Sequence, residues 1–500
     1  MVTPHNTQAI VLAAGKSSRF KTKKSKLLFN ICGRSMIMYP VKALEALNIP
    51  TTIVLGHQAD AVRQEVTQHA QPGIQFALQV EQKGTGDAVA CSRTTWNQEN
   101  ILILYGDTPL ITPSLITELI EIHHTSKATI SFCTTFVIDP TGYGRVLEKD
   151  GKIEIVEEKN CSHDQRQINR INTGVYIMKR AFLENNIDKI AKNQLTGEVY
   201  FVDLIKMACD QGLGVTVQPV AYDYVRGVNT LQDLWEVEQI KRSEFIKHWM
   251  SEGVRFELAQ SIHIDINVKI GSGSFIGTGA HLIGDTVIGE DCFVGAFSII
   301  ENSKIGINTQ IQPHTFIQDS SIGEEVQIGP FARVRGNSEI GNDVQIGNFV
   351  EIKATSIGDH SRTKHLSYLG DATIGKSVNI GAGTIICNYD GVKKNRTIIE
   401  DNAFIGSNNT LIAPVTIGKG SYTAGGSTIN ENVPAGSLAI GRSRQQLKEG
   451  YAEKIKAELV KKHSCACITE DIGKKNAQST MDEALGFHGA IKTTNITDQI

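Results

Sequence analysis

The stretch Val287-Ile288-Gly289-Glu290-Asp291-Cys292-Phe293-Val294-Gly295 carries two aliphatic–glycine pairs six residues apart. The same pair recurs at six residues or near multiples of six: Ile270-Gly271, Ile276-Gly277, Ile322-Gly323, Ile328-Gly329, Ile340-Gly341, Ile346-Gly347, Ile374-Gly375 and Ile380-Gly381. This is the hexapeptide signature of a left-handed parallel β-helix, in which one aliphatic side chain per hexapeptide points inward and stacks on the next coil. We expect glycine, asparagine or aspartate at its turns, because these residues tolerate positive φ.

A second feature interrupts this repeat. The segment Asn388-Tyr389-Asp390-Gly391 contains residues that a solenoid does not need. The repeat alone predicts only a rigid prism, so a structural or spacer role is the alternative until reactive residues are found on its surface. We interpret the interruption as a place where chemistry occurs.

Composition bounds the remaining possibilities. A chain of 500 residues predicts at least two domains, and a net charge of −3 gives no support to nucleic-acid or membrane-surface binding. We find no apolar run that would span a bilayer and no signal-peptide pattern in residues 1–8, which predicts a cytoplasmic protein. The nine cysteines do not predict a disulfide framework, and Cys465 and Cys467 only weakly suggest a metal or redox role.

Before the repeat, apolar strand-like runs alternate with helical stretches. The runs are Ala9–Leu12, Thr52–Leu55, Ile74–Val80 and Ile101–Tyr105. This alternation predicts a Rossmann-like α/β domain with a largely parallel sheet. Ligands of such sheets bind beyond the carboxyl ends of the strands, so the loops there are the candidate sites.

The loop after the first run reads Leu12-Ala13-Ala14-Gly15-Lys16-Ser17-Ser18-Arg19. It contains Gly-Lys-Ser, but Ile10 stands where a phosphate-binding P-loop requires glycine. A loop of small residues still lets backbone amides approach a phosphate, and Arg19 and Lys26 could neutralise a triphosphate.

The loop after the last run places a carboxylate, Asp107, at the tip of a buried strand. Such a carboxylate suits Mg²⁺, which takes oxygen ligands from one or two protein groups and from substrate phosphates. The alternative is an aspartate that caps the following helix.

An ordered series of motifs then resembles the sugar-nucleotide pyrophosphorylases: Leu-Ala-Ala-Gly-x-x-x-Arg at 12–19, Gln82-Lys83-Gly84-Thr85-Gly86, Tyr105-Gly106-Asp107, Thr141-Gly142-Tyr143-Gly144-Arg145, Ile171-Asn172-Thr173-Gly174 and Gly227-Val228-Asn229. With the repeat and its segments His365–Asp371 and Cys387–Gly391, the chain resembles the bifunctional N-acetylglucosamine-1-phosphate uridylyltransferases/glucosamine-1-phosphate acetyltransferases over roughly residues 7 to 450.

The resemblance implies roles for residues of the first half. It places the nucleotide on Leu12, Ala13, Ala14, Gly15, Arg19, Lys26, Gln79, Gly84 and Thr85, the acetylated sugar phosphate on Gly144, Glu157, Asn172 and Asn229, and Mg²⁺ on Asp107 and Asn229. UTP is the implied co-substrate of this half.

For the second half, the resemblance implies that His365 is a general base, since a histidine can accept the proton of an attacking amine near pH 7. It places the sugar phosphate on Arg335, Lys353, Tyr368, Asn379 and Lys394, and acetyl-CoA on Asn388, Tyr389, Ser407, Gly425 and Arg442. It also implies a homotrimer formed through the β-helix, with acetyl-CoA partly between neighbouring prisms. Without the flanking motifs, His365 would read as an exposed loop histidine.

Several positions depart from the family pattern. Ser25 replaces a usual proline before Lys26, Ser17 a common glycine and Asp87 a frequent histidine. In the second half, Lys364 precedes His365 where a neutral residue is usual, Gly336 replaces a proline, and Gly425 stands where alanine is more common. We expect the Lys364 cation to disfavour a charged His365.

The predicted domains are residues 1–230, a linking helix at 231–252, a β-helix at 253–445, and a C-terminal helix with a mobile tail at 446–500. Apolar spacing from Leu231 to Met250 predicts the helix, either as a strut between two sites or as an amphipathic helix packed on the first domain.

We therefore expect an enzyme that acetylates glucosamine 1-phosphate and uridylylates the product. A pyrophosphorylase whose β-helix is not catalytic, and a non-catalytic assembly subunit, are the alternatives.

Overall fold

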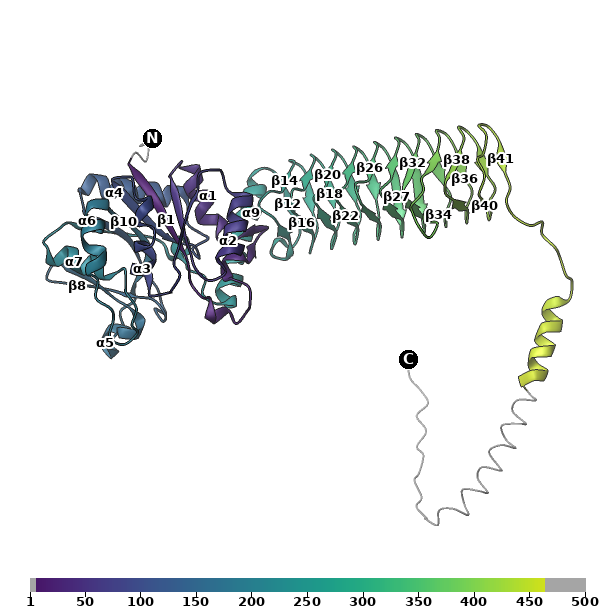
Figure 1. Ribbon diagram of the computed structural model, residues 1–500. Coiled ribbons are helices and arrows are strands. Elements are labelled where there is room, and N and C mark those ends of the chain that lie inside the picture. The colour runs from purple at the N-terminus through teal and green to yellow at the C-terminus, as the bar shows by residue number, and fades with distance from the viewer. Residues whose placement is uncertain (1–5, 464–500) are drawn as a thin grey trace, which may run out of the picture. The chain divides into compact units, whose positions relative to one another are not determined.

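The computed structural model describes residues 6–463, and the chain divides into two compact units, residues 1–441 and 442–500. The first unit contains an α/β domain and a solenoid (Figure 1). The second contains a helix over residues 451–463, within the stretch where sequence predicts one. Cys465, Cys467 and the predicted tail lie outside the described residues.

The α/β domain is built on a mixed sheet with strand order β11-β7-β10-β6-β1-β4-β5. Strands β1, β4, β5 and β6 are parallel and correspond to the four predicted runs. Strand β10 is antiparallel to both β6 and β7, and β8 and β9 form a hairpin. The strands are β1 (Thr7–Ala13), β4 (Thr51–Leu55), β5 (Gln75–Leu78), β6 (Asn100–Tyr105), β7 (Ile130–Phe136), β8 (Arg145–Lys149), β9 (Lys152–Val156), β10 (Arg170–Lys179) and β11 (Val215–Pro219), with β2 (Asn30–Ile31) and β3 (Arg34–Ser35) as a separate ribbon.

One predicted strand was too long. The run Ile74–Val80 is a strand only over β5, because Gln79 turns into the ligand cavity described below and the Val80 side chain is 79% exposed.

Helices cover both faces of this sheet, as the alternation of buried residues in β6 requires. Leu102 and Leu104 join one core with residues of α1, α2 and α4, whereas Ile101 and Ile103 join another with residues of α3, α6 and α7. The helices are α1 (Met38–Ala46), α2 (Ala59–His69), α3 (Thr85–Ala90), α4 (Pro113–Ser126), α5 (His163–Arg166), α6 (Arg180–Asn186), α7 (Asp203–Asp210), α8 (Tyr222–Val225) and α9 (Leu231–Ser251). Short 3-10 segments lie at Ser18–Phe20, Lys26–Leu28, Arg93–Thr95, Glu158–Asn160, Ile187–Lys189 and Ala259–Ser261.

The solenoid is the predicted left-handed β-helix, with three parallel sheets of eleven, ten and nine strands that form its faces 1, 2 and 3. Face 1 comprises β12 (Arg255–Phe256), β15 (Phe275–Ile276), β18 (Phe293–Val294), β21 (Gln310–Ile311), β24 (Gln327–Ile328), β27 (Gln345–Asn348), β30 (Arg362–His365), β33 (Asn379–Ile380), β36 (Phe404–Ile405), β39 (Tyr422–Thr423) and β41 (Leu438–Ala439). Face 2 comprises β13 (His263–Ile264), β16 (His281–Ile283), β19 (Ile299–Glu301), β22 (Phe316–Gln318), β25 (Arg333–Arg335), β28 (Glu351–Lys353), β31 (Tyr368–Gly370), β34 (Ile385–Cys387), β37 (Thr410–Ile412) and β40 (Thr428–Ile429). Face 3 comprises β14 (Lys269–Ile270), β17 (Val287–Ile288), β20 (Lys304–Ile305), β23 (Ser321–Ile322), β26 (Glu339–Ile340), β29 (Ser356–Ile357), β32 (Ala372–Ile374), β35 (Thr397–Ile399) and β38 (Val415–Ile417).

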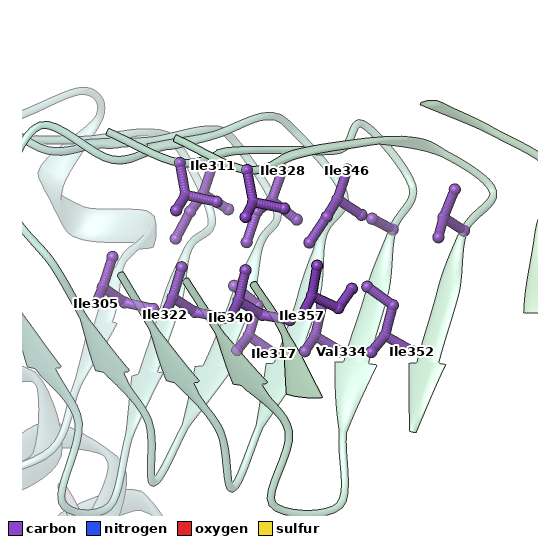
Figure 2. Packing of buried hydrophobic residues seen from close by; sticks show 14 of the residues in the cluster. Ile305, Ile311, Ile317, Ile322, Ile328, Val334, Ile340, Ile346, Ile352 and Ile357 are labelled. Carbon is purple, nitrogen blue, oxygen red and sulfur yellow. The ribbon is translucent and has the colours of Figure 1, made fainter. Parts of the chain in front are cut away.

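Rows of aliphatic side chains fill the interior of the prism. Figure 2 shows Ile311, Ile328 and Ile346 in one such row, and these residues are register partners on successive coils. Each buried isoleucine contributes about 2 kcal/mol through removal of its surface from water. The predicted inward stacking of one aliphatic residue per hexapeptide is confirmed.

The turns follow the predicted residue types only in part. Asp291, Asn308 and Asp343 adopt positive φ as expected. However, the corner between faces 1 and 2 carries Phe297, His314, Phe331, Phe349 and Leu366 in the left-handed region. The rings of the first four stack with centroid separations of 5.0 to 5.4 Å, and this stacking offsets the backbone cost.

Helix α9 joins the two regions and agrees with both interpretations of its sequence. A capping box of Thr230 and Asp233 begins the helix. Val237 is buried in a core of the α/β domain, and Ile246 in the core of the β-helix. Trp235, one of the apolar residues of this helix, is 60% exposed.

Candidate active sites

A cavity of about 480 Å³ lies at the carboxyl ends of the parallel strands of the α/β domain. Every residue predicted to bind nucleotide, sugar or metal in the first half lines it: Leu12, Ala13, Ala14, Gly15, Arg19, Lys26, Gln79, Gly84, Thr85, Asp107, Gly144, Glu157, Asn172 and Asn229. They come from loops far apart in sequence, which the strand order brings to one edge of the sheet.

Three oxygen atoms and two cationic side chains converge at one point of this cavity. Lys26 Nζ donates to Asp107 Oδ2 at 2.5 Å and to the Val228 carbonyl at 2.8 Å, and lies 3.3 Å from Asn229 Oδ1. Arg19 Nη2 donates to the same Asn229 oxygen at 2.7 Å. A carboxylate, an amide and a carbonyl oxygen that surround one cation form a donor set that fits Mg²⁺ with substrate phosphates as its further ligands.

The capping alternative for Asp107 is wrong. The helix that follows, α4, has Thr112 as its N-cap, and the Thr112 hydroxyl accepts a hydrogen bond from the Leu115 amide. Asp107 is therefore free to point into the cavity, where it pairs with Lys26.

The Gln79 side chain is held by two acceptors. Its Nε2 donates to the Gly84 carbonyl at 3.0 Å and to Asp87 Oδ2 at 2.7 Å. Gly84 has φ of +113°, and a Cβ there would lie 2.5 Å from the Val199 carbonyl oxygen, so this turn requires glycine. Asp87, a departure from the family pattern, thus contacts Gln79, one of the residues predicted to bind the nucleotide.

The far wall of the cavity carries a buried carboxyl group. Burial, with lesser contributions from Asp203 and Glu198, raises the pKa of Glu157 above its ordinary value. Nearby, the Tyr176 hydroxyl lies 2.8 Å from Asn172 Oδ1 and holds that amide in place. These two side chains can accept and donate hydrogen bonds to a neutral polar group such as an acetamido sugar.

Two departures near the first loop have local explanations. Ser17 has φ of +54°, a conformation in which glycine costs less than serine. Ser25 has φ of −57°, which proline would tolerate, but its backbone N–H donates to Gln58 Oε1 at 2.7 Å. The serine at this position therefore supplies a hydrogen bond that proline could not.

On the β-helix, three predicted phosphate-binding cations lie near the corner between faces 2 and 3. Arg335 and Lys353 are register partners on successive coils. The Lys353 ammonium lowers the pKa of Lys394, because it can donate to the neutral Lys394 amine and repels the charged form, and Arg335 adds to the repulsion. Glu351 accepts from Arg335 at 2.7 Å and Asp371 from Lys353 at 3.1 Å, so the cations are partly neutralised and held in place.

The interruption at Asn388 forms a turn that organises this cluster. Asp390 accepts hydrogen bonds from the backbone amides of Val392 and Lys393, which lower its pKa to about 2. Tyr389 forms an antiparallel bridge with Lys394, which carries the chain back toward the cations. Asn388 Nδ2 donates to Asp371 Oδ2 at 2.5 Å and lies 3.4 Å from the Tyr368 hydroxyl.

The predicted base lies at the corner between faces 1 and 2. His365 ends β30, its side chain is exposed, and its Nδ1 lies 3.0 Å from Asn348 Oδ1. Further along the same corner, the Gly383 amide donates to the His365 carbonyl and the Gly426 amide to the Ser407 carbonyl. His365, Ser407 and Gly425 therefore follow one edge of the prism.

The remaining predicted residues are less closely tied to this group. Asn379 lies in β33 of face 1, the sheet that also contains His365. Arg442 begins the second compact unit, so its predicted contact with acetyl-CoA stays a prediction. Gly336 has φ of +72°, which proline cannot adopt, so the glycine fits its turn.

Sequence reasoning missed several residues of these sites. Tyr143, Glu198 and Tyr200 line the cavity, and Asp371 joins Lys353 to Asn388. Tyr143 and Asp371 fall inside the quoted motifs and could have been singled out. Glu198 and Tyr200 follow no sequence pattern.

Among the described residues, no helix is long and apolar enough to cross a membrane. In the same part of the chain, no group of three His, Cys, Asp or Glu side chains could hold a metal ion. The point where Asp107 and Asn229 meet offers one carboxylate, so a metal ion bound there would need amide, carbonyl and substrate oxygens as further ligands.

Comparisons with known proteins agree with this architecture. Residues 9–147 match the MobA-like NTP transferase domain, residues 258–365 the GMPPB C-terminal domain, and residues 396–431 the bacterial transferase hexapeptide repeats.

Three bacterial relatives, each named bifunctional protein GlmU, align along almost the whole chain. The protein of Alkaliphilus metalliredigens is 40% identical over 89% of this chain and 97% of its own length. Those of Fervidobacterium nodosum and Clostridioides difficile are 40% and 41% identical over 90% of this chain and 98% of theirs. With this identity across both regions, the chain belongs to the GlmU family of bifunctional enzymes, in which a nucleotidyltransferase domain precedes a hexapeptide acetyltransferase domain.

Proposed function

We propose that the chain makes UDP-N-acetylglucosamine, a precursor for cell-wall and lipopolysaccharide synthesis, in two steps. The β-helix transfers an acetyl group from acetyl-CoA to glucosamine 1-phosphate. The α/β domain then transfers a uridylyl group from UTP to N-acetylglucosamine 1-phosphate and releases pyrophosphate. The observation that carries the proposal is that one chain holds both a cavity lined by every residue predicted to bind the nucleotide and, on its β-helix, a cluster of cations together with an exposed histidine.

In the uridylyl transfer, a phosphate oxygen of the sugar attacks the α-phosphorus of UTP in line. A phosphate oxygen is already anionic at neutral pH, so the protein mainly positions the two substrates and neutralises charge. Arg19 and Lys26 meet the triphosphate, Gln79 reads the base, and Glu157 and Asn172 hold the acetamido sugar. The small residues Ala13, Ala14 and Gly15 let backbone amides approach the phosphates.

Mg²⁺ would be held by Asp107 and Asn229, and would supply charge neutralisation to the reacting phosphates. Lys26 now occupies the point between these two oxygens. Its long side chain can turn toward the triphosphate instead, so that its ammonium group follows the negative charge.

In the acetyl transfer, His365 accepts the proton that the 2-amine of glucosamine 1-phosphate loses as it attacks the thioester carbonyl. The hydrogen bond between Nδ1 and Asn348 orients the ring, which leaves Nε2 for the amine. Arg335, Lys353 and Lys394 hold the sugar phosphate, with Tyr368 and Asn379 completing the acceptor site. Asn388, Tyr389, Ser407, Gly425 and Arg442 contact acetyl-CoA.

The assembly that fits this arrangement is a homotrimer in the cytoplasm. Phe297, Phe331 and Phe349 form an exposed apolar row along the corner that leads to His365. Such a row suits burial against a neighbouring prism, which would also enclose acetyl-CoA. Sedimentation equilibrium measures this directly, and a monomer at the concentration of assay would contradict it.

Product analysis by mass spectrometry tests the proposed function. Purified protein is incubated with glucosamine 1-phosphate, acetyl-CoA, UTP and Mg²⁺, and parallel reactions each lack one component. UDP-N-acetylglucosamine formed only in the complete mixture supports both activities. If it forms only when N-acetylglucosamine 1-phosphate is supplied ready-made, the β-helix is not catalytic and the chain is a single-activity pyrophosphorylase.

A further inference from the structure

We infer that Asp87 is a positioning residue that makes Gln79 a hydrogen-bond acceptor toward the base, and thereby selects uracil over cytosine. The inference rests on the proposed uridylyl transfer and assigns its base specificity to a contact that this chain makes with a residue unusual for the family.

The first step concerns the orientation of the Gln79 amide. Both groups that face it, the Gly84 carbonyl and the Asp87 carboxylate, are acceptors. Only the amide nitrogen can face two acceptors, so the assignment of nitrogen and oxygen follows from the chemistry of the partners. A carboxylate accepts hydrogen bonds only, so it also excludes the flipped amide.

The second step concerns what remains for a ligand. Both Gln79 amide hydrogens are used inside the protein. Among the described residues, Gln79 Oε1 accepts no hydrogen bond, although the side chain lines the cavity and is 3% exposed. A base that reaches Gln79 therefore meets an acceptor oxygen.

The third step is the chemistry of the pyrimidine edge. Uracil and thymine carry a hydrogen on N3 and can donate to Gln79 Oε1, whereas N3 of cytosine is an acceptor that this oxygen would repel. A site built to accept a hydrogen bond rejects a ligand that cannot donate one. Asp87 thus supports UTP against CTP and makes no distinction between UTP and dTTP.

Asp87 lies in the first turn of α3, and Gly84 is the N-cap of this helix. The same helix start therefore supplies both acceptors, and no other side chain is needed to fix Gln79. Asp60, in the first turn of α2, is an exposed acid in a comparable position and offers a matched control.

The test measures kcat/KM with UTP, CTP and dTTP in the Asp87→Ala enzyme, with N-acetylglucosamine 1-phosphate and Mg²⁺. We expect the UTP/CTP ratio to fall about tenfold, the effect of one hydrogen bond to a charged group, because the Gly84 carbonyl alone then holds the amide and the flipped orientation becomes more accessible. The UTP/dTTP ratio stays unchanged. Asp87→Asn, whose side-chain carbonyl still accepts from Gln79, restores most of the ratio, and Asp60→Ala leaves it unchanged.

A second arm separates positioning from folding. In a Gln79→Ala background, adding Asp87→Ala changes the UTP/CTP ratio no further, since Asp87 acts through Gln79. Asp87→Ser carries the same test if the alanine variant fails to fold.

An unchanged UTP/CTP ratio in a folded Asp87→Ala enzyme that still uses UTP overturns the inference and leaves the proposed function standing. An equal loss with all three nucleotides also overturns it. A parent enzyme that uses no UTP overturns the proposed function, and the inference with it.

Discussion

The two candidate sites differ in how the chain gathers their residues. In the α/β domain, loops after strands distant in sequence close around one cavity, and every predicted ligand of the first half lines it. On the β-helix, each coil adds one residue to each edge, so Arg335 and Lys353 lie side by side at the end of face 2, while His365 lies at the end of face 1. The candidate site of the α/β domain is a cavity within the chain, and that of the β-helix lies on its surface.

The two regions exclude water from a reaction in different ways. The α/β domain does so with its own loops, which is why Glu157 can be buried and its pKa raised. The regular coils of the prism offer no long loop that could cover a site, and the chain departs from this regularity where the repeat is interrupted at Asn388. In the trimer that we propose, the surface of a neighbouring chain would close the solenoid site. The two activities of the chain should then respond separately to damage.

We expect the largest loss of activity from a change at Asp107 in the cavity of the α/β domain. Asp107→Ala should lower uridylyl transfer by about a thousandfold or more, since it removes the carboxylate that would hold Mg²⁺ beside the reacting phosphates. Acetyl transfer should be unchanged. Separate assays with N-acetylglucosamine 1-phosphate and with glucosamine 1-phosphate measure both, and a folded variant that loses both activities would contradict independent sites.

The matching change on the surface is His365→Ala. Acetyl transfer should fall by about 10²- to 10⁴-fold, the usual contribution of a general base, with uridylyl transfer unaffected. His360→Ala is the control, because His360 is an exposed histidine nearby in the chain that pairs with Asp343. Equal losses in the two variants would show that His365 is an ordinary surface residue.

A smaller effect on stability should distinguish the core of the β-helix from the cores of the α/β domain. Ile352→Ala opens a cavity in the coil that carries Lys353, at a cost of about 2 to 5 kcal/mol in unfolding free energy. Because each coil contacts only its neighbours, the damage should be confined to the solenoid. Acetyl transfer should then be lost at a lower temperature while uridylyl transfer keeps its thermal profile, and parallel loss of both on heating would argue that the regions unfold as one unit.

The smallest effect concerns pH and the α/β domain alone. Burial lowers the pKa of His123 from 6.5 to about 4, and its ring lies 2.9 Å from Ser131 Oγ. Between pH 6.5 and pH 4, His123 binds a proton in the unfolded chain but not in the folded chain. The contribution of His123 to the free energy of unfolding is therefore complete above pH 6.5, and it decreases as the pH drops toward 4, by up to about 1.4 kcal/mol per pH unit.

Thermal unfolding followed by loss of uridylyl transfer at several pH values checks this slope, and His123→Gln should flatten it. A variant whose melting temperature still falls as steeply as the parent's would assign the pH dependence to other groups.

The sequence predicted the helices and strands of the fold better than it predicted which strands pair and which residues pack together. Ile–Gly spacing specified the solenoid because one coil repeats the same local environment, and all the quoted isoleucines are buried. Strand β10 escaped prediction because its antiparallel pairing depends on strands β6 and β7, far away in the chain. The aromatic corner at Phe297 and Phe331 escaped it because stacking between coils outweighs the local preference for glycine or asparagine.

The candidate sites followed the same rule. Motifs identified Asp107 and Asn229 separately, but their meeting around Lys26 joins segments from three parts of the chain. Asp87 looked like a mere departure, and its meaning came only from the bond to Gln79. Residue types can be read locally, whereas the geometry that gives them a role is long-range.

Helix α9 has a consequence for solubility. Strands β12, β13 and β14 of the first coil each pair with only one neighbour, so this end of the solenoid is a set of open strand edges. Such edges invite end-to-end polymerisation into fibres. Ile246 of α9 lies in the core behind them, and the Ile266 amide after β13 donates to the Cys32 carbonyl of the α/β domain. Helix α9 and the α/β domain thus cover this end of the solenoid and block pairing with another chain. A β-helix expressed without them would be prone to aggregate.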